Sequence, residues 1–240
     1  MKISVVLAAY NEEKLIGRCI EAIQNQDFPK NEYEIVVVDN NSKDRTSQIV
    51  KKAGIAPFLY DAHQGAIWAK DYAVKKAKGE IVVVTDADSI PQKDWLKNID
   101  AIMEDKKIKL AGGKVYPIGN SFTSRLLLEA FDVAARVLSI FGVPLVWGSN
   151  MVVRKSAFEA VGGFDTTLHS SDDWEFTLRV QKRYGLKSSI YTNKMKVNVS
   201  PRKFESTDNF IPYFLNGFFS FISIFIFRRA WRAGAIATVR

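Results

Sequence analysis

The sequence predicts an α/β fold, in which helices flank a mostly parallel central sheet. Two observations support this prediction. Over the first 120 residues, short runs rich in valine and isoleucine alternate with segments that have helical periodicity. Each run is almost continuously apolar, which is typical of strands that helices cover on both faces. Because such strands pair in parallel through right-handed crossovers, ligands are expected just beyond their carboxyl ends.

Four strands and three helices are expected in the first half of the chain. The strands span residues 3–7, 34–38, 57–60 and 80–85. Apolar residues at helical spacing mark two of the helices, at Leu15, Ile16, Cys19, Ile20 and Ile23 and again at Ile67, Ala69, Ala73 and Val74. The remaining helix passes through Ile49 and Val50, and we expect Ser42 or Asp44 to cap it.

Two more helices are expected in the second half. An amphipathic helix is expected within residues 121–146. Pro144 comes soon after its end, as is usual for a residue that cannot continue a helix. Another helix is expected to begin near Asp172 and Asp173 and to run to Tyr184, where Gly185 stops it.

Composition narrows the classes of function. The 240 residues include 34 Lys and Arg against 26 Asp and Glu, and the net charge of +8 favours a negatively charged partner. Cys19 is the single cysteine, and His63 and His169 are the only histidines, which excludes disulfides within the chain, multi-thiolate sites and multi-histidine zinc sites. The sequence has no P-loop, no Gly-x-Gly-x-x-Gly after the first strand and no Gly-x-Ser-x-Gly. Nucleic acid is the weakest partner, because a basic and aromatic stripe is missing outside the C-terminal tail.

Acidic residues follow two of the expected strands. Asp86 and Asp88 come directly after the fourth strand, and Asp39 follows the second. A carboxylate pair with substrate phosphates is a common way to hold Mg²⁺ or Mn²⁺. Asp39 could accept hydrogen bonds from a base or a ribose. The structural alternative is that each aspartate simply fills a turn, for which this residue type is favoured.

A third acidic segment opens the expected helix at Asp172 and Asp173. A carboxylate held at the mouth of the sheet can act as a general base toward a hydroxyl group. The alternative is electrostatic, since acidic residues in a first helical turn are favoured by the helix dipole.

In their order along the chain, these segments resemble the signatures of family 2 glycosyltransferases. The corresponding residues are Val5-Val6-Leu7-Ala8-Ala9-Tyr10-Asn11-Glu12, Val38-Asp39-Asn40-Asn41-Ser42-Lys43-Asp44-Arg45-Thr46, Gly65 with Ala69-Lys70-Asp71 and Ala77-Lys78-Gly79-Glu80, Asp86-Ala87-Asp88, Gly162-Gly163-Phe164-Asp165, and Asp172-Asp173. Each motif is weak alone, and the specificity comes from their order over roughly residues 2–200. The resemblance implies a GT-A fold, with a Rossmann-like sheet, and an inverting sugar transfer.

The resemblance also implies a role for each matching residue. Asp173 would be the catalytic base, and Asp86 and Asp88 would hold a divalent cation, Mg²⁺ or Mn²⁺. The nucleotide of a UDP- or GDP-linked sugar would contact Ala8, Ala9, Tyr10, Glu12, Val38, Asp39, Lys70, Asp86, Ala87 and Lys114. Arg202 and Lys203 would bind the diphosphate or an acceptor phosphate.

Four positions depart from the family pattern. Ala8 stands where proline is usual, Lys70 replaces an arginine, and Ala73 replaces a glycine; the acidic pair is Asp172-Asp173 instead of Glu-Asp. Lysine is a point charge, whereas arginine is a planar fork. No chemically required group is lost, but these departures concern the contacts to the nucleobase.

The C-terminal segment differs from the rest. Residues 210–227 carry no charge, and as a helix they would reach about 27 Å, just short of a ~30 Å hydrocarbon core. Arg228, Arg229, Trp231 and Arg232 follow, a combination typical of a membrane interface. We favour an interfacial helix or a re-entrant pair over a single span, because a span would place these arginines on the far side, against the positive-inside rule. A buried or oligomer-forming helix is the alternative.

The resulting prediction is a catalytic domain over residues 1–205, with a nucleotide-binding half at 1–120 and an acceptor-binding half at 121–205. Residues 206–240 would form a hydrophobic helical segment that associates with the cytoplasmic face of a membrane. The acceptor would then be lipid-linked, for example a polyprenyl phosphate. Two alternatives stay open: a nucleotidyltransferase of similar layout, and a non-catalytic module that binds nucleotides at a membrane surface.

Overall fold

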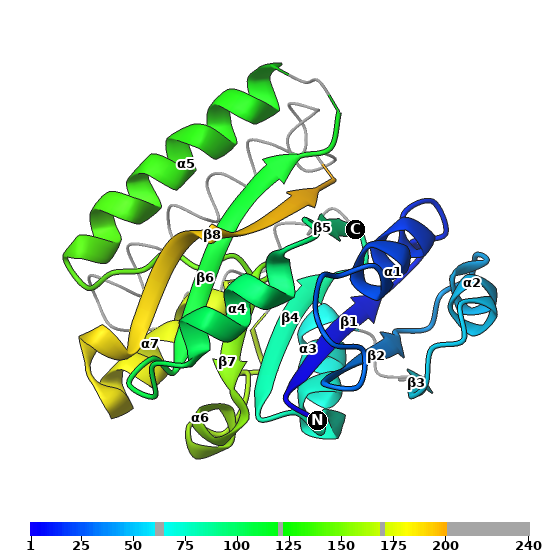
Figure 1. The fold of residues 1–240 in the computed structure, drawn as a ribbon, viewed down its shortest axis with the longest axis horizontal. Helices are drawn as coiled ribbons and strands as arrows, with labels where there is room; N and C mark the ends of the chain where they lie inside the picture. The colour runs from blue at the N-terminus through cyan, green and yellow to red at the C-terminus, as the bar shows by residue number, and fades with distance from the viewer. Residues whose placement is uncertain (61–64, 120–121, 169–170, 201–240) are drawn as a thin grey trace.

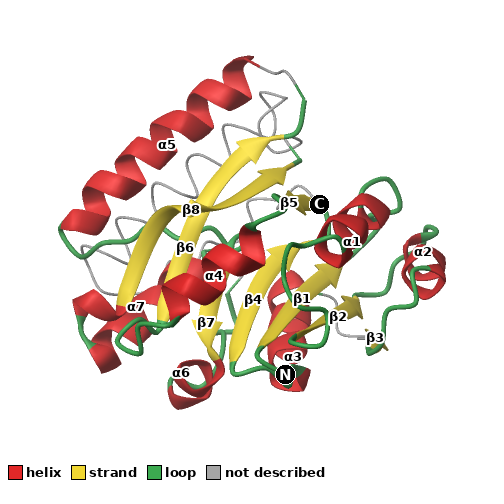
Figure 2. Ribbon diagram, viewed as in Figure 1, coloured by secondary structure: helices red, strands yellow, loops and turns green. Residues whose placement is uncertain are grey.

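The computed structural model describes residues 1–60, 65–119, 122–168 and 171–200, which form one eight-stranded sheet between helices (Figures 1 and 2). The strands are β1 (Ile3–Ala9), β2 (Tyr33–Asp39), β3 (Phe58–Tyr60), β4 (Ile81–Asp86), β5 (Ser89–Pro91), β6 (Leu110–Pro117), β7 (Met151–Arg154) and β8 (Ser189–Val199). The helices are α1 (Ile16–Gln24), α2 (Thr46–Lys52), α3 (Ala66–Lys76), α4 (Trp95–Met103), α5 (Phe122–Ile140), α6 (Lys155–Ala160), α7 (Asp172–Tyr184) and the 3₁₀ turn η1 (Leu186–Ser188).

The strands follow the order β3-β2-β1-β4-β7-β6-β8-β5 across the sheet. The first four strands of this order pair in parallel, as predicted. In the second half, β7 is antiparallel to both β4 and β6, and β5 is antiparallel to β8, while β6 and β8 are parallel. The sheet is therefore mixed, and its antiparallel part was not predicted.

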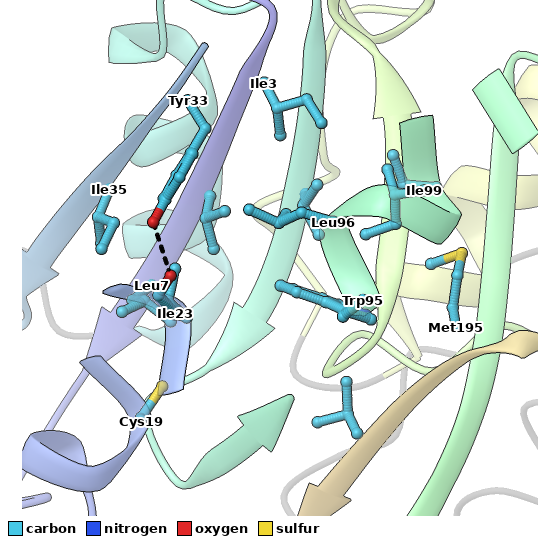
Figure 3. Close-up of a cluster of buried hydrophobic side chains, with 14 of the residues drawn as sticks. Ile3, Leu7, Cys19, Ile23, Tyr33, Ile35, Trp95, Leu96, Ile99 and Met195 are labelled. Carbon is cyan, nitrogen blue, oxygen red and sulfur yellow. Dashed lines mark hydrogen bonds between the residues drawn. The ribbon is translucent and has the colours of Figure 1, made fainter. Parts of the chain in front are cut away.

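Alternation along β1 explains the two layers of the core. Val5 and Leu7 belong to the cluster under α1 and α4, whereas Val6 belongs to the cluster under α3, α6 and α7. Figure 3 shows the first cluster, in which Leu7 and Trp95 lie between the sheet and the two helices. Apolar side chains on both faces of one strand are the reason that its sequence reads as a continuous apolar run.

The predicted elements of the first half are confirmed with ends shifted by one or two residues, and α5 and α7 are confirmed in the second half. Gly185 ends α7 with φ 90°, as expected. The predicted caps of α2 are wrong, because the N-cap residue is Arg45 and no side chain caps the helix. Asp44, the residue before the N-cap, accepts the Thr46 N–H through Oδ1 at 2.9 Å, and Ser42 Oγ accepts from the Asn11 N–H at 3.0 Å.

Within the described ranges, none of the helices has the length and apolarity needed to cross a bilayer. The predicted C-terminal segment, residues 206–240, lies outside the described residues, and so do Arg202 and Lys203. One continuous sheet joins the predicted nucleotide-binding and acceptor-binding halves. The division between these halves stays a prediction.

Replacing Gly79 by alanine should destabilise the fold by about 1–3 kcal/mol, because the added methyl overpacks a rigid contact. A Cβ on Gly79 would lie 2.6 Å from the backbone nitrogen of Ser4 and 2.7 Å from the carbonyl carbon of Ile3. Urea unfolding of Gly79→Ala measures the effect. Gly17→Ala in α1 is the control, since its nearest neighbour is Ile49 Cγ2 at 3.5 Å and the change should stabilise by about 0.5–1 kcal/mol. Equal midpoints for the two variants would contradict this account.

Candidate active site

The carboxyl ends of the parallel strands place four predicted residues side by side. Ala8 pairs with Asp86 of β4 on one side, and Ala9 pairs with Asp39 of β2 on the other. The arrowheads of β1, β2 and β4 point to the same edge of the sheet in Figure 2. The end of β1 therefore lies between the two aspartates, as the sequence predicted.

Two further elements bring charged side chains to this edge. Lys70 of α3 places its Nζ 3.0 Å from Asp86 Oδ1. Asp173, in the first turn of α7, accepts hydrogen bonds from the Gly148 N–H at 2.8 Å and from the Trp174 N–H at 2.9 Å. A Cβ on Gly148 would lie 3.2 Å from Lys70 Nζ and 3.5 Å from Asp173 Oδ2. Lys70 and Asp173 thus both lie against Gly148, and Asp86 is bound to Lys70.

The segment that carries Gly148 is held by its neighbours. Thr85, the residue before Asp86, donates its hydroxyl hydrogen to the Ser149 carbonyl at 2.7 Å. Asn150 is fully buried; its amide donates to the Met195 carbonyl at 3.1 Å and its oxygen accepts from Trp95 Nε1 at 2.9 Å. Sequence reasoning missed these positioning residues.

The surroundings of Asp173 and Lys70 raise the pKa values of both groups. Burial and the neighbouring Asp172 raise the pKa of Asp173 to about 7, against the lowering effect of Lys70 and two backbone N–H groups. Burial opposes the charge of Lys70, but Asp86, Asp172 and Asp173 outweigh it and raise the pKa of this ammonium above its ordinary value. The site therefore pairs a permanent cation with a carboxyl that titrates near neutrality, as is common where proton transfer occurs.

Residues that fit a divalent cation lie at the end of β4. Burial is the main cause that raises the pKa of the Cys19 thiol, and the negative charges of Asp88, Asp86 and Glu12 add to it. Asp172 Oδ2 is buried without a hydrogen-bond partner in the described part of the chain. The described residues contain no cluster of three His, Cys, Asp or Glu side chains arranged for a metal. These carboxylate oxygens fit Mg²⁺ or Mn²⁺ held by one or two aspartates together with substrate phosphates.

Asp39 is bound within its own turn. Its side chain is 1% exposed; Oδ1 accepts from the Ser42 N–H at 3.0 Å, and Oδ2 accepts from the Ser47 hydroxyl. The oxygen of the next side chain, Asn40 Oδ1, is buried with no partner among the described residues. Asp39 thus shapes the turn beside the predicted nucleotide pocket, and its contact with a base stays a prediction.

The second signature segment also holds the turn after β1. The Asn11 N–H donates to Ser42, the Glu12 N–H donates to Thr46 Oγ1 at 2.8 Å, and the Glu13 N–H donates to Asp44 Oδ2 at 3.0 Å. The turn that carries Tyr10 and Glu12 is therefore fixed by side chains of the next loop.

The sequence profile described as Glycosyl transferase family 2 matches residues 4–162, and a second profile, Glycosyltransferase like family 2, matches residues 113–231. The chain belongs to glycosyl transferase family 2. Glycosyltransferase AglE of Haloferax volcanii is 30% identical over 185 residues, which is 74% of this chain and 60% of that protein. A dolichyl N-acetyl-α-D-glucosaminyl phosphate 3-β-D-2,3-diacetamido-2,3-dideoxy-β-D-glucuronosyltransferase of Methanococcus voltae is 30% identical over 217 residues, 80% of this chain and 64% of that protein. The chain thus spans less than two thirds of both relatives.

Solved structures agree on the fold of this family 2 chain. The mannosyltransferase PcManGT of Pyrobaculum calidifontis, in complex with GDP-Man and Mn²⁺, superposes with a TM-score of 0.77 at 22% identity, over 97% of this chain and 66% of that one. Residues 1–349 of TarS from S. aureus, in complex with UDP-GlcNAc, give a TM-score of 0.66 at 24% identity. The match covers 83% of this chain and 58% of that one. The predicted α/β arrangement of the GT-A type is confirmed for the described part of the chain.

Two residues of the family 2 signature segments, Asp71 and Gly163, have contacts that serve the fold. Asp71 is 4% exposed; it accepts the Phe164 N–H at 3.0 Å and pairs with Lys75 at 2.6 Å. Gly163 has φ 77°, and a Cβ there would lie 2.5 Å from Asp71 Oδ1. Together they fix α3 against the segment that leads to α7, which carries Asp173.

Lys114 is engaged away from the aspartates of the site. Its Nζ lies 2.8 Å from Glu129 Oε2 and 3.3 Å from Asp132 Oδ2, both on α5. Its predicted contact with the diphosphate would require these ion pairs to open. The role stays a prediction, as do those of Arg202 and Lys203 beyond the described residues.

Replacing Lys70 by methionine should slow sugar transfer and move the acidic limb of its pH profile to higher pH. Lys70 lowers the pKa of Asp173, so its loss favours the protonated carboxyl, which cannot accept a proton. Initial rates between pH 5.5 and 9 measure the shift. Lys70→Arg keeps the charge and should keep the limb in place; an unmoved limb in Lys70→Met would contradict the coupling.

Proposed function

We propose that this chain is an inverting, cation-assisted glycosyltransferase that moves a sugar from a nucleoside diphosphate to an acceptor. The observation that supports it best is the contact of Lys70 with Asp86 beside the Gly148 N–H that holds Asp173. The strand-end carboxylate of Asp86, a fixed positive charge and a carboxyl group whose pKa is raised to about 7 support this proposal. The family supports the reaction class.

In this mechanism Asp173 accepts the proton of the acceptor hydroxyl as its oxygen attacks the anomeric carbon. The bond from that carbon to the diphosphate oxygen breaks on the opposite face, so the configuration inverts. Lys70 would stabilise the negative charge that grows on the leaving diphosphate. When bound at Asp86 and Asp88, the cation supplies further positive charge for the same leaving group.

The proposed general base, Asp173, indicates which class of acceptor the chain uses. A phosphate oxygen is mostly ionised at neutral pH and attacks without a base, whereas a sugar hydroxyl needs one. Asp173 therefore favours a hydroxyl acceptor over a polyprenyl phosphate. The Methanococcus relative is named for transfer onto a sugar that a dolichyl phosphate carries. We infer a hydroxyl of a lipid-linked sugar, and hence a reaction at a membrane surface.

A thermal-shift screen of uridine, guanosine and thymidine diphosphates with Mn²⁺ tests the donor site. One of them should raise the unfolding temperature, because a ligand at 100 times its Kd stabilises by about 2.7 kcal/mol. Transfer from the matching nucleotide sugar is then measured as release of the diphosphate. Release of pyrophosphate from a nucleoside triphosphate would instead indicate a nucleotidyltransferase, and binding without turnover would indicate a non-catalytic module.

A further inference from the structure

Helix α5 exposes apolar side chains on the face that points away from the sheet. Phe122 is 78% exposed and Ile140 is 82% exposed. With 3.6 residues per turn, the exposed apolar residues fall within about a third of the circumference. This α5 outer face consists of Phe122, Leu126, Ala130, Val133, Ala134, Val137 and Ile140. Figure 1 shows α5 along the rim of the molecule, with β6 and β8 on its inner side.

An ordinary surface helix carries polar residues opposite its buried stripe. On α5 the charged residues lie instead on one flank: Arg125 is exposed there, and Glu129, Asp132 and Arg136 are turned to partners. Asp132 is 2% exposed; it accepts the Tyr191 hydroxyl at 2.8 Å, and Arg136 lies 3.0 Å from it. Glu129 is paired with Lys114 at 2.8 Å. The outer face is left without any charge, which is a poor match to water.

The C-terminal end of α5 meets a basic cluster. Phe141, 73% exposed, follows the helix, and the next residue, Gly142, lies against Leu186, which is 52% exposed. Around Leu186, the exposed cations are Lys182, Arg183 and Lys187. Tyr184, between them, has Lys109 Nζ 5.5 Å and Arg183 Cζ 5.8 Å from its ring centre. We call Lys182, Arg183 and Lys187 the basic tip.

We propose that the α5 outer face and the basic tip dock this domain on an anionic lipid surface. Apolar and aromatic side chains next to lysine and arginine are the composition of helices that lie in a membrane interface. Charge complementarity selects lipid as the occupant, because the basic tip would meet anionic headgroups. The outer face extends over the 19 residues of α5, about 28 Å, which suits a flat surface.

This inference rests on the proposed function only in placing the reaction at a membrane, and it adds how the domain is oriented there. The inner side of α5 contacts the site: the Phe131 ring lies 4.2 Å from the ring of Trp147, and the next residue, Gly148, holds Asp173. A helix is about 10 Å thick. Docking through α5 therefore brings lipid headgroups within roughly one helix diameter of Trp147, so that a lipid-linked acceptor can reach the base.

Sedimentation of the full chain with vesicles tests the docking. The variant Leu126→Gln/Val133→Gln/Ile140→Gln should bind vesicles of phosphatidylcholine with phosphatidylglycerol roughly thirtyfold more weakly, since bound apolar area is lost. The matched control Leu126→Met/Val133→Ile/Ile140→Leu keeps the apolar area and should bind like the unmodified chain. In the variant Arg183→Gln/Lys187→Gln, the affinity for these vesicles should fall about fivefold for each charge removed. Its affinity for vesicles of phosphatidylcholine alone should be unchanged.

Equal vesicle binding by the glutamine variant and the control would overturn the proposal. So would a dimer of the unmodified chain that the glutamine variant converts to a monomer without any binding to vesicles, because the face would then join two copies. The thermal shift by nucleoside diphosphate with Mn²⁺ separates this inference from the proposed function. If that thermal shift is missing but the glutamine variant binds vesicles more weakly than the control, the docking proposal stands and the proposed function fails.

Discussion

Replacing Asp173 by asparagine should lower sugar transfer to a hydroxyl acceptor by about 10²–10⁴-fold, the usual contribution of a general base. Asparagine keeps the shape and can still accept the Gly148 N–H at the position where the carboxylate accepts it at 2.8 Å. Binding of the nucleoside diphosphate should be unchanged, since Asp86, Asp88 and Lys70 are intact. Initial rates and thermal shifts on the same preparation measure the two effects.

The matched control is Glu175→Gln, two residues further along the first turn of the same helix. It removes the same charge from α7, but Glu175 is committed to Arg179, at 2.6 Å from its Nε. We expect its transfer rate to stay within a few-fold of the unmodified chain. A comparable loss in both variants would mean that the charge of the helix terminus matters and that Asp173 is no base.

The transfer rate and the free energy of unfolding should change with pH in opposite directions. Asp173 must be ionised to accept a proton, so the rate should rise with pH through the raised pKa of about 7. The same shift makes the charged group unfavourable in the fold. Because the folded pKa lies above the ordinary 3.8, the folded chain binds more protons between these values, and the free energy of unfolding falls as pH rises through that window. Asp173→Asn should therefore unfold at a higher temperature than the unmodified chain at pH 8, and at a similar temperature at pH 4.

The sequence predicted the parallel half of the fold and the acidic strand ends because both follow from local rules. Val36, Val37 and Val38 mark a buried strand, and its end places Asp39 at the edge where ligands bind. The resemblance added Asp173, which no local pattern distinguishes from an ordinary acidic helix start. That Asp173 lies near the strand-end aspartates depends on the tertiary structure. The order of the motifs predicted it, and the contacts of Lys70 with Asp86 and beside Gly148 support it.

Two of the positioning contacts could not be found from the sequence because they use backbone groups of Gly148 and Ser149. Gly148 holds Asp173 with an N–H that every residue except proline has, and Ser149 is held through its carbonyl. The antiparallel strands were missed for another reason. Gly112 and Gly113 interrupt β6, and glycine is depleted in strands. A usable signal did exist in β8, where Met195, Val197 and Val199 are buried at every second position.

Replacing Asp86 by asparagine should abolish the stabilisation by nucleoside diphosphate with Mn²⁺ and lower transfer by at least about 10²-fold. Asp86 is the carboxylate that both pairs with Lys70 at 3.0 Å and ends the strand beside Ala8. Its loss removes a charged ligand of the cation and leaves the Lys70 ammonium without its nearest partner. Thermal shifts are measured with Mn²⁺ alone, with diphosphate alone and with both.

Asp165→Asn is the matched control for this prediction. Asp165 also ends a signature segment, but its Oδ1 accepts from the Thr167 N–H at 3.0 Å and from the Thr167 hydroxyl at 2.6 Å, as a turn residue does. It should keep the full shift with both ligands. If Asp86→Asn keeps that shift as well, the carboxylates after β4 do not hold the cation. The donor would then have to be bound by neutral groups and by Lys70, whose positive charge attracts a diphosphate with or without a metal.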